Sequence, residues 1–110
     1  MSSTFWDRLD ELIRSSEIIL DRPNRITTPP VDYGYLSGTS GGDGDEIDVW
    51  KGSLPQTDVD AIVCTVDLRK RDTEVKVLIG CSDAEKKSIC EFHTSDRTAA
   101  LLVQRNAPFQ

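Results

Sequence analysis

The sequence predicts a mainly β domain, a small five-stranded barrel with one helix before its strands and another late in the chain. Two observations support this class. Short β-rich runs recur between turn residues, with clear alternation at 74–81, and helical spacing occurs in one early and one late stretch. A chain of 110 residues is long enough for one domain with a small core. We expect an N-terminal helix at 1–16 and the barrel at 17–110.

The first helix is predicted from apolar side chains at helical spacing, with charged residues between them. This apolar face has two aromatic rings, and its members are Phe5, Trp6, Leu9, Leu12 and Ile13. Ser3 or Thr4 can cap the first turn. We expect the face to pack on the barrel or, in a chain this small, to seal a homo-oligomer.

The predicted strands are short and bounded by turn residues. The first, at 18–20, ends in the turn at 21–24, and a loop then continues to Pro30. The remaining strands are expected at 47–50, 61–68, 74–81 and 99–104.

Alternation is clearest in the strand at 74–81. Val75, Val77 and Ile79 point to one side of it, and Glu74 and Lys76 point to the other. This pattern is typical of a strand with one wall in the core and one wall in a site.

A second helix is predicted directly after this strand. Ser82 and Glu85 have the spacing of a capping box at its start, and Ile89 and Phe92 would form its inner stripe.

Three aspartates lie close together among glycines at 41–49. Glycine permits the tight turns that could bring Asp43, Asp45 and Asp48 together. Clustered carboxylates repel one another unless a cation compensates them, and oxygen ligands select magnesium, manganese or calcium over zinc. The segment is a candidate site for a hard cation. The alternative is a solvated acidic turn between two strands.

Tyr33-Gly34-Tyr35 precedes this acidic segment. Together with Asp43-Gly44-Asp45-x-x-Asp48-Val49 it resembles the signature of the soluble inorganic pyrophosphatases of the all-β, magnesium-dependent type. The resemblance implies an OB-like barrel. It also implies hydrolysis of inorganic pyrophosphate to phosphate with Mg²⁺, for which Mn²⁺ could substitute.

The resemblance implies roles for individual residues. Asp45 would be the general base or would orient the attacking water. The metal ligands would be Asp43, Asp48, Asp67 and Glu74, with Asp72 as the rival of Asp67. The substrate would contact Arg22, Tyr33 and Lys76. Each of these three also has an ordinary alternative, as a surface arginine, a core tyrosine and a lysine paired with Glu74 on its strand.

Two departures indicate a short, divergent member of that family. The helix at 1–16 replaces a longer segment of strands, with Glu17 as the nearby acid. His93 and Thr94 replace a tyrosine-lysine pair of the late helix, and His93 is more often a packing residue than a catalyst. Four functions remain open: pyrophosphate hydrolysis, hydrolysis of a related phosphoanhydride, a catalytically silent module that binds metal and phosphate, and a structural dimer.

The composition limits the classes of partner that the protein can bind. The formal net charge of −6 argues against nucleic acid and anionic membranes, which need clustered cations. No apolar run has the length of a membrane span and no secretory signal is evident, so we expect a cytoplasmic protein. Cys64, Cys81 and Cys90 should then be reduced, and their spacing does not suggest zinc.

Overall fold

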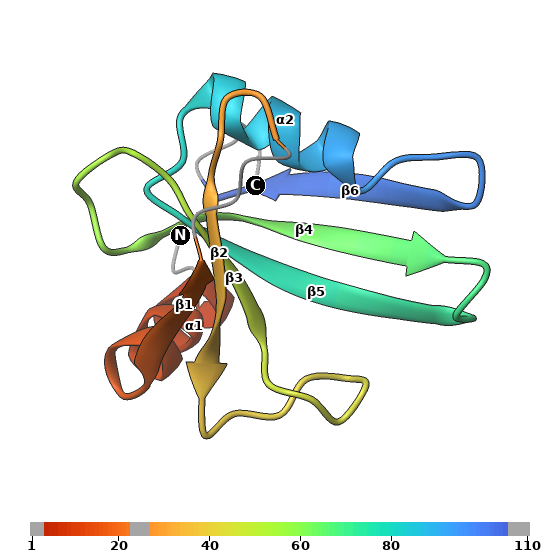
Figure 1. The fold of residues 1–110 in the computed structure, drawn as a ribbon. Helices are drawn as coiled ribbons and strands as arrows, with labels where there is room; N and C mark the ends of the chain where they lie inside the picture. Colours follow the sequence, from red (N-terminus) through yellow and green to blue (C-terminus); the bar gives the residue numbers. More distant parts are fainter. Residues whose placement is uncertain (1–3, 23–26, 106–110) are drawn as a thin grey trace.

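The structure is a computed structural model that describes residues 4–22 and 27–105. Six strands form one sheet in the order β1-β2-β3-β5-β4-β6, and one helix packs on each face (Figure 1). The elements are α1 (Thr4–Arg14), β1 (Glu17–Arg22), β2 (Asp32–Ser37), β3 (Asp48–Lys51), β4 (Val59–Asp67), β5 (Asp72–Ile79), α2 (Asp83–Phe92) and β6 (Thr98–Gln104). The prediction of a mainly β domain with an early and a late helix is confirmed.

The sheet is open. Its edges are β1, which pairs with β2, and β6, which pairs with β4. Among the described strands, neighbours run antiparallel except β3 and β5, which are parallel. The expected five-stranded barrel is therefore not confirmed, either in its closure or in its number of strands. The additional strand is β2, which contains the Tyr33-Gly34-Tyr35 motif.

Gly34 explains how β2 fits against β1. It is paired with Leu20, and a Cβ at this position would collide with the carbonyl oxygen of Ile19. Glycine is therefore needed for the close approach of the two strands. Because a glycine interrupts the side-chain alternation, the pattern of 32–37 did not indicate a strand.

Helix α1 covers one face of the sheet. The core on that face combines two helix residues with strand residues: Trp6, Ile13, Leu36, Val49, Val59, Ile62, Val77 and Ile79. Phe5 was predicted to share the buried face, but its side chain is 57% exposed. Successive helix residues are about 100° apart around the axis, so burial of Trp6 leaves Phe5 at the margin of the contact.

Asp10 fixes α1 to the sheet. Its carboxylate accepts the backbone N–H of Val59 at 3.2 Å and forms an ion pair with Arg105 at 2.8 Å. Asp10 is 7% exposed, so these partners satisfy a buried charge that would otherwise be costly.

Helix α2 covers the opposite face. The core beneath it contains Val31, Trp50, Ala61, Val63, Leu78, Cys81 and Ile89. The predicted capping box is confirmed, because Ser82 Oγ accepts the N–H of Glu85 at 3.2 Å and Glu85 Oε1 accepts the N–H of Ser82 at 2.8 Å. Phe92 was expected on the inner stripe but is 44% exposed, since the last turn of α2 borders a cavity.

The alternation predicted in β5 is confirmed. Val77 and Ile79 belong to the core under α1, whereas Leu78 belongs to the core under α2. Lys76 lies on the α2 side and is buried. Val75 was expected in the core but is 50% exposed, so one face of β5 is open near its start.

Within the described part of the chain, no helix has the length and apolar composition needed to cross a membrane. Cys64, Cys81 and Cys90 are free thiols, and burial raises the pKa of Cys81 to about 12.

Candidate functional site

The strand register brings several of the predicted site residues onto the α2 side of the sheet. Tyr33 is paired with Trp50 across β2 and β3, and Trp50 is paired with Leu78 across β3 and β5. Because alternate residues of a strand share a face, Asp48 and Lys76 lie on the same side as Tyr33. Three residues distant in sequence thus meet on neighbouring strands.

Lys76 is the centre of this group. Its ammonium lies 2.6 Å from Asp48 Oδ2 and 3.2 Å from Glu74 Oε2. Burial alone would lower the pKa of Lys76, but the hydrogen bond to Asp48 and the surrounding negative charges raise it above its ordinary value. Lys76 is therefore a permanently charged cation between two of the predicted metal ligands.

Asp43 joins this group from the loop between β2 and β3. Its pKa is lowered, first by the N–H of Asp45, which it accepts at 3.0 Å, and then by a hydrogen bond with Glu74. The pKa of Glu74 is raised, chiefly by burial, although Lys76 opposes the shift. Three acids, Asp43, Asp48 and Glu74, therefore lie around one ammonium, and Glu74 protonates more readily than Asp43.

Tyr33 forms a wall of the site. Its ring packs on Trp50 with centroids 4.7 Å apart, and the ammonium of Lys76 lies 6.0 Å from its centroid. Burial, followed by the charge of Asp48 and a hydrogen bond to it, raises the pKa of Tyr33 to about 12 against the opposing charge of Lys76. Its hydroxyl therefore keeps its proton at neutral pH and can act as a donor.

His93 is a site residue that the sequence analysis assigned to packing. Its Nε2 accepts the indole N–H of Trp50 at 3.3 Å. Burial, reinforced by the charge of Lys76, lowers the pKa of His93 to about 4. The imidazole is neutral at pH 7. No spacing signal could have linked His93 to Trp50, because they are 43 residues apart.

A cavity of about 360 Å³ extends from this group along the α2 side. Residues of four strands, the β4–β5 turn, the end of α2 and the segment after it line this cavity: Tyr33, Thr65, Val66, Asp67, Arg69, Lys70, Asp72, Glu74, Lys76, Phe92, His93, Ser95 and Thr98. Its size is at the lower end of the range for small-molecule pockets, about 300 to 1,000 Å³. The lining is rich in charged and hydroxyl groups, as a site for a small ionic ligand requires.

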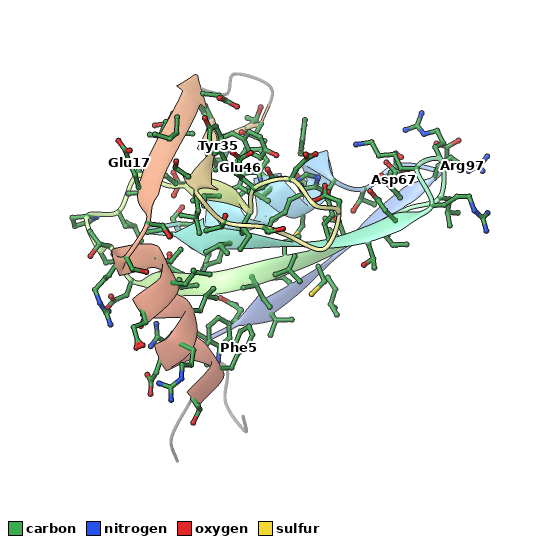
Figure 2. All side chains as sticks on the ribbon, turned by 90° about the horizontal axis from the view of Figure 1, so that it is seen from below. Phe5, Glu17, Tyr35, Glu46, Asp67 and Arg97 are labelled. Atoms are coloured by element: carbon green, nitrogen blue, oxygen red, sulfur yellow. The ribbon has the colours of Figure 1, made fainter. Side chains whose placement is uncertain are left out.

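Asp67 and its rival Asp72 both line the cavity, but at its outer end. They are paired with each other across β4 and β5, whereas Asp48 is level with Lys76. Lys76 is four positions along β5 from Asp72, a distance of about 13 Å. Figure 2 shows Asp67 near one end of the molecule, far from Tyr35. Asp67 therefore does not lie beside Asp48.

The remaining predicted residues lie elsewhere. Asp45 is exposed in the loop at 41–46 and does not line the cavity. The backbone of Arg22 is paired with Tyr33, but its side chain is outside the described part of the structure.

Asp43, Asp48 and Glu74 supply oxygen donors, which suit magnesium in their chemistry. Among residues 4–22 and 27–105, however, no three Asp, Glu, His or Cys side chains are arranged to hold a metal ion. The point between Asp48 and Glu74 is occupied by the ammonium of Lys76. The donor chemistry fits magnesium, whereas this arrangement is that of an ion-pair network.

Comparison with protein families supplies the class of the protein. The family model for inorganic pyrophosphatase matches residues 25–100. The chain therefore belongs to the inorganic pyrophosphatase family, and the resemblance noted in the sequence is confirmed. No curated protein and no solved structure gave a significant match.

Proposed function

We propose that this chain hydrolyses inorganic pyrophosphate to phosphate in a magnesium-dependent reaction. The observation that carries the proposal is the contact of Lys76 with Asp48 and Glu74 beside Tyr33, inside the segment that matches the family. This group combines a fixed cation for a phosphate oxygen with carboxylates for a metal, and Lys76, Glu74 and Tyr33 line a cavity of suitable size.

The residues of the chain have separate tasks in this proposal. Lys76 contacts a phosphate oxygen as a point charge, and the hydroxyl of Tyr33 donates a hydrogen bond. Neutral His93 accepts a hydrogen bond from the indole of Trp50, and the Trp50 ring in turn packs against Tyr33. Asp45 is proposed as the base or water-orienting group, which requires the loop at 41–46 to bring it to the cavity, and Arg22 as a further phosphate contact.

Magnesium would be held by Asp43, Asp48 and Glu74, and when bound it would neutralise phosphate charge and assist the ionisation of water. Asp67 or Asp72, at the outer end of the cavity, would meet a metal only if the substrate carried it there. In the structure, Asp48 and Glu74 are engaged with Lys76.

A second candidate is a catalytically silent module that binds pyrophosphate. The observation that favours it is the same ammonium, which already compensates the two carboxylates and so removes part of their attraction for a metal.

The test is phosphate release from pyrophosphate by the purified full chain, with magnesium and with a chelator. Release that requires magnesium and is lost in Lys76→Met supports hydrolysis. Absence of release together with calorimetric binding of pyrophosphate would support the silent module instead. Manganese in place of magnesium should restore at least part of the activity.

A further inference from the structure

Four cationic side chains gather at the outer end of the molecule, although the whole chain is acidic. Arg69, Lys70 and Arg71 form the turn between β4 and β5. Arg97 belongs to the neighbouring turn before β6, where its carbonyl accepts the N–H of Leu68 at 2.9 Å. Figure 2 shows Arg97 beside Asp67 at this end.

These four side chains are not engaged in ion pairs with the described residues. None of the four forms an ion pair or a side-chain hydrogen bond with the residues at 4–22 or 27–105. Lys70 and Arg69 lower the pKa of Asp67 chiefly through their backbone N–H groups, which donate to its carboxylate at 3.2 and 2.9 Å. Their side chains remain available to a ligand.

Arg69 and Lys70 differ from Arg71 in where they lie. The first two line the cavity that contains Tyr33 and Lys76, whereas Arg71 lines a separate hollow beside Val66 and Leu68. Arg71 has a positive φ of 57°, a left-handed conformation that reverses the chain at this point. One turn therefore presents its cations to two different surfaces.

The cavity is longer than a pyrophosphate ion. It extends over about 13 Å of β5, from Lys76 to Asp72, before it reaches the turn. Pyrophosphate has two phosphoryl groups joined by one oxygen, so an ion held at Lys76 leaves the outer end unfilled. Ser95 and Thr98 add hydroxyl groups there, and the carboxylates of Asp67 and Asp72 keep the end from being purely cationic.

We propose that Arg69 and Lys70 form a second anion subsite, which binds the third phosphate of a linear polyphosphate chain. The substrate class is then a phosphoanhydride longer than pyrophosphate, with its terminal phosphate at Lys76 and its far end at the β4–β5 turn. This inference rests on the proposed function for the location of the first phosphate. It does not require that the chain be catalytically active.

The test uses two analogues with nitrogen in place of every bridging oxygen, imidodiphosphate and the one-unit-longer diimidotriphosphate, with magnesium. Binding to the full chain is measured by titration calorimetry at two salt concentrations. The wild type should bind the longer analogue about tenfold more tightly, as expected for added charge-assisted contacts. In Arg69→Gln/Lys70→Gln this preference should disappear, with little change for the shorter analogue.

The matched control is Arg71→Gln/Arg97→Gln. It removes the same two charges from the same end of the molecule but from outside the cavity. It should retain most of the preference at the higher salt concentration, because salt screens long-range attraction more strongly than contacts inside the cavity. Equal losses in the two double variants would refute the subsite and leave only general electrostatic attraction.

The two proposals fail separately. If phosphate is released from pyrophosphate but the longer analogue binds no better, the subsite is refuted and the hydrolase stands. If the longer analogue shows the expected pattern but no phosphate is released, the subsite stands in a silent module. Binding of neither analogue refutes the subsite as well as the silent module.

Discussion

Lys76 and Asp48 form a short ion pair of 2.6 Å across the parallel strands β3 and β5, with the lysine side chain only 8% exposed. Asp48 and Lys76 lie opposite each other because the residues that follow them, Val49 and Val77, are paired across the two strands. The pair therefore connects the centre of the sheet to the loop that contains the acidic segment. This ion pair contributes to the structure and is also part of the candidate functional site.

Lys76→Met should destabilise the fold. The change preserves the length of the side chain but leaves Asp48 and Glu74 with uncompensated charge, which we expect to cost about 1 to 3 kcal/mol because both acids are partly exposed. The free energy of unfolding from urea titrations measures this. Asp48→Asn should cost less in the Lys76→Met background than in the wild type.

The control for Lys76→Met is Lys87→Met, an exposed lysine of α2. Its effect should stay within about 0.5 kcal/mol, as is usual for surface positions. Additive effects of Lys76→Met and Asp48→Asn would show that the ion pair contributes nothing to stability.

His93 should make stability fall at acid pH. Its pKa is about 4 in the folded protein and about 6.5 in an unfolded chain. Between these values the unfolded state binds more protons, so stability is present above pH 6.5 and is lost as the pH falls toward 4. His93→Gln keeps an acceptor for the indole of Trp50 but does not titrate, and its stability should vary less over this window.

Glu74, whose pKa is raised, also affects stability near pH 4, as does the titration of the carboxyl groups in general. The useful quantity is therefore the difference between wild type and His93→Gln at each pH, from thermal melts between pH 4 and 8. A difference that does not change with pH would contradict a neutral, buried His93.

Asp10 should contribute to stability and not to catalysis. Asp10→Ala removes the acceptor for Val59 N–H and leaves the partly buried Arg105 without its close partner, so we expect a loss of roughly 2 to 4 kcal/mol. Asp58→Asn disrupts only the exposed contact of 4.0 Å with Arg14 and should cost less than about 0.5 kcal/mol. Urea titrations compare the two variants. If the two variants lost equal stability, the buried contacts of Asp10 would contribute no more to stability than the exposed contact of Asp58.

Elements with a local signal were predictable from sequence. The capping box of Ser82 and Glu85 marks the start of α2, and the alternation around Val77 marks β5. The strand β2 was missed because Gly34 is required by contact with Ile19, a property of the packed sheet. Closure of the sheet into a barrel was also expected and is not confirmed, since strand pairing at the edges depends on long-range register that periodicity does not encode.

The candidate site was predictable in composition but not in connection. Tyr33, Asp48, Glu74 and Lys76 were identified from residue type and family resemblance, and three strands bring them together. Their ion pairing with one another was considered only for Lys76 and Glu74. The partnership of His93 with Trp50 arises from packing of α2 on the sheet, for which the sequence contains no local signal.

Asp45 and Asp48 should have separable roles if the proposed function is correct. Asp45 is exposed and donates its N–H to Asp43, so Asp45→Asn should preserve the fold and metal binding while strongly reducing turnover. Asp48→Asn should reduce turnover, stability and metal binding together. Phosphate release and isothermal titration with magnesium distinguish them, and equal loss of metal binding in the two variants would contradict the assignment.

Magnesium should raise the melting temperature of the wild type. A ligand at about 100 times its dissociation constant adds about 2.7 kcal/mol to folding, a shift on the order of several degrees for a domain of this size. Sodium chloride at matched ionic strength should give a smaller shift, because screening supplies no coordination. Asp48→Asn should respond less than wild type, whereas Asp58→Asn, outside the site, should respond fully.

Lys76→Met gives the sharpest form of this test. If the ammonium competes with magnesium for Asp48 and Glu74, its removal should increase the melting shift caused by magnesium, even though the variant is less stable without metal. The proposed hydrolase requires some shift in the wild type, and competition requires a larger one in the variant. A melting temperature that is indifferent to saturating magnesium and manganese in both proteins would exclude the metal site and, with it, magnesium-dependent hydrolysis at these residues.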